Sequence, residues 1–308
     1  MKVIIFGAGV QGTVYGVRLA RAGHEVTLVA TPRRAVELRR FGATIRNAET
    51  SEAISADVAI CEELPPDCKA DLCLVRVRRE QLDNALISVT RATEIERFVF
   101  LVNHANGSED IFEALGRPRT VLAFPGIAGT YQEDAVGYID VFQQHTVVEA
   151  SAAEVVDLFR GAGFLVDRVR DMDAWLKRHA VFITSIAGAL YEKDCSPTQL
   201  AKDHGAVRRF ILAVRGGWLE LDRREVDSAP WALKFIFCQA PLWFSVRYWA
   251  KLLSSARGEL YFAAHARHAP AEMAALASDV RNFIPGGKPP ELARLLNAIQ
   301  NGRSTSYS

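Results

Sequence analysis

Three glycines near the beginning of the chain have the spacing of a turn that binds phosphate. The segment Gly7-Ala8-Gly9-Val10-Gln11-Gly12 follows an apolar run at residues 2–6 and precedes a helical pattern at residues 13–22. In such a strand–turn–helix unit the glycines permit a tight turn and a close approach of pyrophosphate, and the helix N-terminus attracts anions. We therefore predict a dinucleotide site, the alternative being a glycine-rich turn without a ligand. The residues expected to bind it are Gly7, Gly9, Val10, Gln11 and Gly12.

The second predicted strand, residues 25–30, is followed by two arginines rather than by a carboxylate. Sites for NAD usually place Asp or Glu here to bind the ribose 2′-hydroxyl, but in this chain the first acid is Glu37. Because a guanidinium binds phosphate through two hydrogen bonds, we expect Thr31, Arg33 and Arg34 to hold the 2′-phosphate of NADP(H). The alternative is that the arginines begin a solvent-exposed helix.

The first half of the chain has the pattern of a scaffold that could position these residues. Short apolar runs alternate with helical segments, which indicates a mostly parallel sheet covered on both faces. The further predicted strands are residues 56–60, 70–75, 98–102, 120–124 and 164–166, with looser strand patterning at 136–148. We therefore predict an α/β fold with an N-terminal Rossmann-type, doubly wound sheet, in an NADP-binding domain of residues 1–168.

Helical periodicity replaces the strand patterns after Asp171. The predicted helical stretches are residues 172–193, 198–226, 231–255, 270–284 and 290–300. This pattern predicts an all-helical C-terminal domain, residues 169–308. We expect this domain to serve substrate binding and dimerisation. Because ligands of such sheets bind at the carboxyl ends of the strands, we expect the substrate between the two domains.

Composition and charge exclude several classes of protein. The net charge of +1 over 308 residues provides no field for nucleic acid. The five cysteines contain no C-x-x-C pair, which favours the reduced thiols of a cytoplasmic protein over disulfides or a metal site. Lys234, Pro241 and Arg247 interrupt the most apolar stretch, so we expect no membrane span. A strand that begins at residue 2 also disfavours a cleaved signal peptide.

Several segments together resemble the ketopantoate reductase family, the NADPH-dependent enzymes of pantothenate synthesis and their paralogues. The resemblance lies in residues 2–12, 19–29 and 70–78, in Asn106-Gly107 and in Trp175-Leu176-Lys177. It implies that Arg78, where the family commonly has lysine, lies beside the cofactor. It also implies that Asn106 contacts the cofactor and the substrate, and that Lys177 is the general acid.

Lys177 also suits this role on chemical grounds. Hydride addition to a ketone builds negative charge on oxygen, and a nearby ammonium group stabilises that charge and donates the proton. The alternative is a surface lysine on the first turns of a helix, which is where most lysines lie.

The chain departs from the family pattern on the substrate side. The family has two asparagines at the fourth and eighth residues after the lysine, and this chain has Val181 and Ser185 there. This spacing would place Lys177, Val181 and Ser185 on one face of a helix. The resemblance therefore implies that Val181 and Ser185 line the substrate site. The family motif T-E-I-D-x-x-N-G is absent, and we expect either Glu272 or the His265/His268 pair to replace its acid.

We expect an NADPH-dependent reductase of a small 2-oxo acid or related ketone, and a divergent paralogue rather than a ketopantoate reductase proper. An alternative is a non-catalytic NADP(H)-binding sensor or scaffold, which the missing asparagines would suit. A third, opine-type condensation of an amine with a keto acid, has no recognisable amine site.

Aromatic residues concentrate in residues 231–255, and interface cores are rich in such residues. We therefore expect a homodimer that uses part of this segment. The aromatic residues are Trp231, Phe235, Phe237, Trp243, Phe244, Tyr248 and Trp249.

Overall fold

A computed structural model describes residues 1–142, 144–223, 231–285 and 289–302 of the chain. The chain forms two compact units. Unit 1 consists of Met1–Asn103 and Ser108–Met172, and unit 2 of His104–Gly107 and Asp173–Ser308. The main division therefore lies between Met172 and Asp173, four residues beyond the boundary expected from the sequence, and a four-residue segment of the first half joins unit 2.

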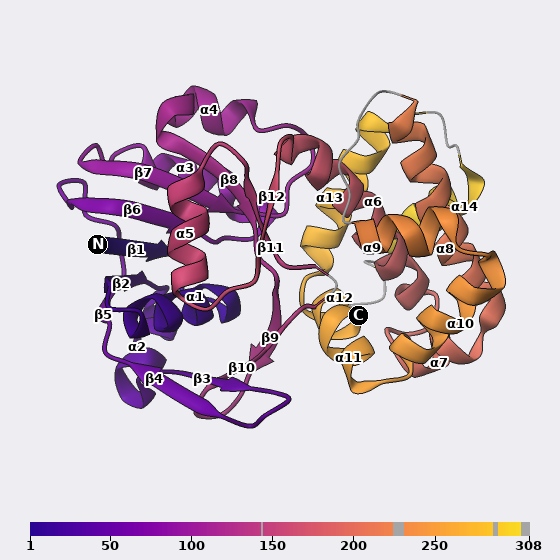
Figure 1. Cartoon of the computed structure of the whole chain (residues 1–308), viewed down its shortest axis with the longest axis horizontal. Coiled ribbons are helices and arrows are strands. Elements are labelled where there is room, and N and C mark those ends of the chain that lie inside the picture. Colours follow the sequence, from indigo (N-terminus) through magenta and orange to yellow (C-terminus); the bar gives the residue numbers. More distant parts are fainter. Residues whose placement is uncertain (143, 224–230, 286–288, 303–308) are drawn as a thin grey trace. The chain divides into compact units, whose positions relative to one another are not determined.

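Unit 1 is built on an eight-stranded sheet in the order β12-β11-β8-β7-β6-β1-β2-β5 (Figure 1). Its strands are β1 (Lys2–Phe6), β2 (Glu25–Val29), β5 (Ala59–Cys61), β6 (Ala70–Val75), β7 (Ile95–Leu101), β8 (Thr120–Phe124), β11 (Thr146–Glu149) and β12 (Val166–Val169). All neighbours are parallel except β8 and β11. From β5 to β8 the order is that of a Rossmann sheet. The predicted fold class is confirmed.

The central strands of this sheet are buried because helices cover their apolar side chains. Val3 and Ile5 of β1, for example, are 1% and 0% exposed. The helices of unit 1 are α1 (Val10–Arg21), α2 (Pro32–Phe41), α3 (Leu82–Val89), α4 (Glu109–Leu115) and α5 (Ala153–Gly161), with short 3-10 turns at Arg79–Gln81 and Arg117–Arg119. The continuous apolar runs in the sequence thus correspond to strands covered on both faces.

A second, four-stranded sheet packs against α1, and of its strands the sequence predicted only β10, within the looser strand patterning at 136–148. Its order is β4-β3-β10-β9, and Figure 1 shows it beside α1 and α2. The strands are β3 (Ala43–Asn47), β4 (Ala53–Ala56), β9 (Ile127–Tyr131) and β10 (Val136–Asp140). One edge thus comes from the segment after α2 and the other from a hairpin that follows β8.

Polar contacts fix α1 to the β9–β10 hairpin. Arg18 donates two hydrogen bonds to Asp140, at 2.9 and 2.6 Å, and its guanidinium carbon lies 4.8 Å from the centre of the Tyr138 ring. Gln11 Nε2 donates to the carbonyl oxygen of Ile127 at 2.6 Å. The helix that follows the glycine turn is therefore held from the main sheet on one side and from the hairpin on the other.

Unit 2 is helical in its described part. Its helices are α6 (Met172–Tyr191), α7 (Pro197–Lys202), α8 (His204–Asp222), α9 (Trp231–Lys234), α10 (Leu242–Leu253), α11 (Ala256–Gly258), α12 (Ala264–His268), α13 (Pro270–Phe283) and α14 (Pro290–Gly302), with π-helical turns η3 (Phe235–Gln239) and η4 (Glu259–Ala263). The helix expected at 198–226 is two helices, because Asp203 ends α7 and caps α8. Residues 224–226 lie outside the described residues.

The core of unit 2 is aromatic at its centre. The Phe182 ring lies 5.6 to 6.2 Å from those of Phe210, Phe237, Trp249 and Phe262. Ala105, from the short segment that joins unit 2, belongs to the same buried cluster and is 2% exposed.

Candidate functional site

Two of the three glycines in the turn after β1 are required by the protein's own packing. Gly7 has φ +108°, a conformation that favours glycine, and a Cβ there would clash with the carbonyl oxygen of Arg76. A Cβ at Gly12 would clash with the carbonyl oxygen of Gly7. These two glycines allow β1, α1 and β6 to come together.

Gly9 is different, because a Cβ there would clash with no atom of the described residues. Among the described residues, the only neighbouring atom within 4 Å of a Cβ built there is Tyr131 Oη, at 3.7 Å, an ordinary contact distance. Gly9 is the N-cap of the twelve-residue α1, whose first turn contains no acid, and the first N–H groups of a helix lack partners within it. Space and free donors therefore coincide, and a pyrophosphate fits this turn.

Next to the turn lies a cavity of about 470 Å³ between the beginning of α2 and the β9–β10 turn. It is lined by Thr31, Arg33, Arg34, Glu37, Phe41, Gly42, Thr44, Tyr131, Gln132, Glu133, Asp134 and Ala135. The three residues predicted to bind a 2′-phosphate thus lie together at one cavity of unit 1.

The two arginines of this cavity are held differently. Arg34 is 18% exposed in its side chain, with Nη1 3.1 Å from Glu37 Oε2. Its Nε donates to the carbonyl oxygen of Ala8 at 3.2 Å, and its guanidinium lies over the Tyr131 ring, 5.0 Å from the centroid. The Arg33 side chain is 92% exposed, with only Nε 3.4 Å from Glu37 Oε1. Arg34 is therefore fixed beside the glycine turn, and Arg33 is free to reorient.

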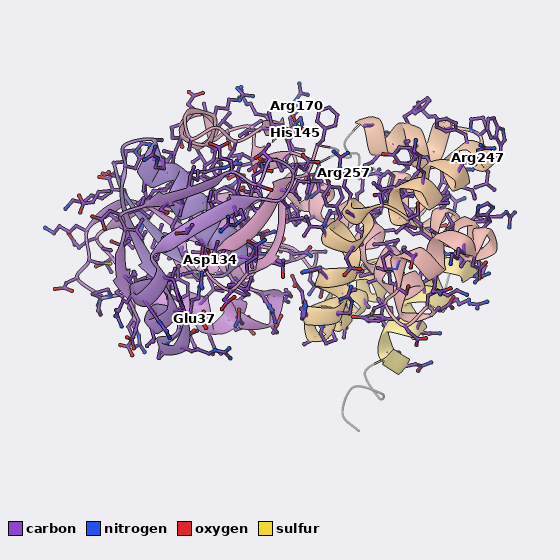
Figure 2. All side chains as sticks on the ribbon, turned by 90° about the horizontal axis from the view of Figure 1, so that it is seen from below. Glu37, Asp134, His145, Arg170, Arg247 and Arg257 are labelled. Atoms are coloured by element: carbon purple, nitrogen blue, oxygen red, sulfur yellow. The ribbon has the colours of Figure 1, made fainter. Side chains whose placement is uncertain are left out.

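Carboxylates give the cavity a mixed charge. The hydrogen bond from Arg34, together with the charges of both arginines, lowers the pKa of Glu37, which therefore stays ionised. Asp134 pairs with Arg46 at 3.0 Å. Glu37 and Asp134 both line the cavity, and Figure 2 labels both on unit 1. An anion at this cavity must therefore compete with Glu37 for the two guanidinium groups.

At the end of β6 the structure brings Arg76, rather than Arg78, to the glycine turn. Arg78 is exposed, and its backbone N–H donates to Gln81 Oε1 at 3.1 Å. Arg76 Nε donates to Gln11 Oε1, and Nη1 to the carbonyl oxygen of Val77 at 2.8 Å. Sequence reasoning missed Arg76, although its place directly after a buried strand was a usable signal.

Of the two asparagines that follow β7, one is buried and the other is exposed to solvent. Asn106 is exposed and lies in the segment that joins unit 2. Asn103 belongs to unit 1 and is 6% exposed, and its buried Oδ1 accepts no hydrogen bond from any residue that the structure describes. Sequence reasoning missed Asn103, although it too follows a buried strand at the carboxyl edge of the sheet.

In unit 2, Lys177 lies early in α6. Its side chain is partly exposed and forms no ion pair or hydrogen bond within the described ranges of the chain. Val181 and Ser185 are both fully buried in the core, and Ser185 Oγ donates to the carbonyl oxygen of Val181 at 2.6 Å. Their predicted contact with substrate gains no support from this placement.

Glu272 lies in a group of titratable residues on unit 2. It is 1% exposed, and its Oε2 is 3.3 Å from Nε2 of the partly exposed His265. His179 stacks on Trp175, with 5.1 Å between the ring centroids, and the charges of His265 and Glu272 both affect its pKa. Burial first, and His265 second, lower the pKa of His179 to about 3, so this ring is neutral near pH 7. The sequence offered Glu272 and the His265/His268 pair as alternatives to the family's acid. The structure brings Glu272 and His265 together, whereas His268 is exposed.

The described part of the chain shows neither a metal centre nor a membrane-spanning helix. It contains no group of three or more His, Cys, Asp or Glu residues arranged to hold a metal ion. None of its helices combines the length and the apolar character that crossing a membrane requires.

Part of the chain is similar to a known protein family. Residues 3–150 match the family model described as ketopantoate reductase PanE/ApbA. A 2-dehydropantoate 2-reductase from Pyrococcus horikoshii is 27% identical over 188 residues, which are 57% of this chain and 58% of that protein. The match thus spans little more than half of the relative's length.

Solved structures share the whole fold at low identity. A PanE/ApbA family ketopantoate reductase from Ralstonia eutropha JMP134 has a TM-score of 0.73 and 19% identity, with 100% of both chains covered. The ternary structure of D-mandelate dehydrogenase with NADH and anilino(oxo)acetate has a TM-score of 0.68 and 15% identity, with 99% of both chains covered.

Proposed function

We propose that this chain is a reductase that uses NADPH to reduce a small 2-oxo acid or related ketone. The premise is the match of residues 3–150 to the ketopantoate reductase PanE/ApbA family. The observation that carries the proposal is the glycine turn at the N-terminus of α1, next to the cavity with Arg33 and Arg34. A phosphate group bound close to the backbone would account for Gly9 in this turn.

The residues of unit 1 fit the parts of the cofactor. The backbone N–H groups at Gly9, Val10 and Gln11 would hold the pyrophosphate, since they begin α1. Thr31, Arg33 and Arg34 would bind the 2′-phosphate from the neighbouring cavity. Preference for NADPH over NADH is our inference, supported by the two guanidinium groups at the position where NAD sites usually have an acid. The D-mandelate dehydrogenase named above contains NADH.

The residues of unit 2 would act on the carbonyl group. The nicotinamide, when bound, supplies a hydride to the carbonyl carbon. The Lys177 ammonium group would stabilise the negative charge on the oxygen and donate the proton there. We propose that Asn106 orients the carbonyl group and that Glu272 takes the place of the acid in the missing family motif. Arg78, which belongs to unit 1, would lie beside the cofactor. The buried Asn103 amide is a further candidate for a cofactor contact, because its oxygen lacks a partner among the described residues.

The substrate class is a proposal as well. The two similar proteins named as reductase and dehydrogenase act, by their names, on 2-dehydropantoate, a 2-oxo acid, and on D-mandelate, a 2-hydroxy acid. The reduction of a 2-oxo acid gives a 2-hydroxy acid, so both names support the same type of reaction. Val181 and Ser185 replace the two asparagines of the family pattern, and this loss of amide side chains is our reason for proposing a substrate with fewer polar groups than ketopantoate. The proposed substrate class therefore includes ketopantoate, the intermediate of pantothenate synthesis, together with other 2-oxo acids.

Turnover and a lysine variant test this function. Purified protein should oxidise NADPH in the presence of at least one member of a panel of aliphatic and aromatic 2-oxo acids. Lys177→Ala should lower kcat by a factor of about 10² or more without weakening NADPH binding. The matched control is Lys202→Ala, at an exposed residue at the end of α7. Full activity of Lys177→Ala would remove Lys177 from the proposed role.

A second candidate function is an NADP(H)-binding sensor or scaffold without catalysis. The specific observation in its favour is that Ser185 donates its hydroxyl proton to its own helix inside the core. Tight NADPH binding without turnover on the whole panel would support the sensor over the reductase.

We also propose a reducing compartment, such as the cytoplasm. The support is that Cys61, Cys68, Cys73, Cys195 and Cys238 are all free thiols.

A further inference from the structure

Tyr131 is an exposed aromatic residue that the proposed function has not used. It ends β9 at the edge of the second sheet, and 53% of it is exposed. Large aromatic side chains usually have a polar or apolar partner that explains their position, and the ring of Tyr131 lies under the Arg34 guanidinium. The Tyr131 hydroxyl makes no hydrogen bond with any residue in the described part of the chain.

The position of Tyr131 is set by the packing of its hairpin on α1. A Cβ at Gly129 would approach Val10 Cγ1 to 2.9 Å and Tyr138 Cα to 3.2 Å, so only glycine allows β9 to lie this close. The hydrogen bond from Gln11 to the carbonyl oxygen of Ile127 fixes the beginning of the same strand. The hairpin therefore has a defined register relative to the glycine turn.

At the turn between β9 and β10, a second anchor is an ion pair. Asp134 Oδ2 is 3.0 Å from Arg46 Nη2 on β3. The strand and its turn are thus held at both ends, and Tyr131 lies between the two anchors.

This register places the phenol group at the dinucleotide site. Tyr131 Oη is the atom that a Cβ on Gly9 would meet, at 3.7 Å, and it is the only neighbour within 4 Å of that point among the described residues. The hydroxyl thus stands over the middle glycine, where the N-terminus of α1 attracts a phosphate group. The ring, at the same time, forms one wall of the cavity that contains Arg33 and Arg34.

We propose that Tyr131 is a cofactor-binding residue supplied by the second sheet. Its hydroxyl donates a hydrogen bond to an oxygen of the cofactor's pyrophosphate, and its ring holds the Arg34 guanidinium toward the 2′-phosphate. The proposal rests on the proposed function, because it requires that a nicotinamide dinucleotide binds over Gly9. It assigns the recognition of pyrophosphate and of 2′-phosphate to two separate parts of one side chain.

The two parts are separated by two substitutions and two cofactors. Tyr131→Phe removes only the hydroxyl and should weaken NADPH and NADH binding by the same factor of about ten, since both contain a pyrophosphate. Tyr131→Leu removes the ring as well and should additionally lower the preference for NADPH by a factor of about two to five, the usual size of a partly exposed cation–π contact. Dissociation constants come from protein fluorescence or calorimetric titration, without turnover.

The matched control is Phe142→Leu, because Phe142 is an aromatic residue of unit 1 that is 74% exposed and lies outside the cavity. This control should bind both cofactors like the unchanged protein, and thermal unfolding should confirm that all three variants fold. Unchanged or tighter binding of both cofactors by Tyr131→Phe and Tyr131→Leu would overturn the proposal alone. Failure of the unchanged protein to bind either cofactor would overturn the proposed function together with it.

Discussion

Arg33 and Arg34 are neighbours in the sequence, but the protein constrains their guanidinium groups to very different degrees. Arg34 contacts the glycine turn through the carbonyl oxygen of Ala8 and carries the Tyr131 ring on one face. Arg33 has Glu37 as its ion-pair partner and is otherwise in solvent. Loss of Arg34 therefore disturbs the turn as well as the cavity, whereas loss of Arg33 removes a charge and little else.

This contrast predicts different cofactor effects for the two variants. Arg33→Ala should weaken NADPH binding about tenfold and leave NADH binding unchanged, because only NADPH carries the 2′-phosphate. Arg34→Ala should weaken both, and the double variant should lose most of the preference for NADPH. The preference of the unchanged protein should shrink with added salt. Titration of both cofactors decides this, with Arg21→Ala on the exposed end of α1 as the control. Equal affinity of the unchanged protein for NADPH and NADH would reject the 2′-phosphate assignment.

The buried His179 predicts a pH dependence of stability in unit 2. Its pKa is about 3 in the folded protein, against 6.5 ordinarily, so between these values the unfolded chain binds more protons. Stability from this residue is complete above pH 6.5 and declines as the pH falls toward 3, at up to about 1.4 kcal/mol per pH unit. His179→Phe keeps a ring against Trp175 and should flatten this decline in denaturant titrations between pH 4 and 7.

The comparison for this slope is His204→Gln, at an exposed histidine that begins α8. That variant should retain the decline of the unchanged protein. Equal slopes for His179→Phe and the unchanged protein would show that His179 is not buried as a neutral ring.

At the scale of helices and strands, Asp203 shows how one residue divides a predicted helix. Its Oδ1 accepts the N–H of Ala206 at 2.9 Å and its Oδ2 pairs with Lys193 at 2.8 Å. The lysine first, and the backbone N–H second, lower the pKa of Asp203 to about 2. The carboxylate thus begins α8 and ties this point to the end of α6.

Removal of this cap should destabilise unit 2. Asp203→Ala should lower the free energy of unfolding by about 1 kcal/mol, and Asp203→Asn, which can still cap α8, should lose less. The stabilising effect of the carboxylate is complete above its ordinary pKa of 3.8 and is lost as the pH falls toward 2. Chemical denaturation at pH 7 and pH 3 measures this. An equal difference between Asp203→Ala and the unchanged protein at both values would contradict the assignment of the effect to the charge.

The sequence predicts some elements of unit 1 well for a physical reason. β1, β6 and β8 are buried on both faces, so they appear as continuous apolar runs that few other structures produce. The second sheet lacks this signal. Its strand β3 contains Thr44, Arg46 and Asn47, and β9 contains Gly129 and Thr130, so neither has an uninterrupted apolar run. These strands exist because they pair with each other and pack on α1, which is information about tertiary structure.

In the candidate site, too, some features follow from a local sequence pattern and others depend on tertiary contacts. The glycine turn is a local pattern of six residues and was predictable in position and purpose. The pairing of His265 with Glu272 joins α12 and α13 across the break at Ala269, and the approach of His179 from α6 depends on how three helices pack. The presence of Tyr131 over Gly9 depends on pairing within the second sheet. Contacts between distant segments leave no local pattern in a single sequence.

At the scale of the whole molecule, the aromatic segment 231–255 divides into core and surface. Phe237 and Trp249 are 0% and 1% exposed and belong to the core of unit 2. Trp243, Phe244 and Phe235 are 66%, 40% and 45% exposed. The side chain of Trp231 lies outside the described residues. The prediction that this segment forms an interface therefore depends on the three exposed rings.

A homodimer remains the expected assembly. Light scattering at micromolar concentration should give twice the chain mass of 34.0 kDa, because exposed aromatic residues of this kind are enriched at interface cores. Trp243→Glu should reduce the mass to that of one chain, and Phe142→Glu, in unit 1, should leave the dimer intact. A mass near 34.0 kDa for the unchanged protein would reject the dimer.

The short segment His104–Gly107 has a consequence for anyone who wishes to express the dinucleotide-binding unit alone. The segment lies between two parts of unit 1 but clusters with unit 2, and its Ala105 is buried in the core of that unit. A gene fragment that ends near residue 172 would therefore still encode a piece whose partners have been deleted. A stable fragment would need a short flexible turn in place of His104–Gly107, between Asn103 and Ser108. The fragment would then not expose to solvent the Ala105 side chain, which is buried in unit 2 of the full chain.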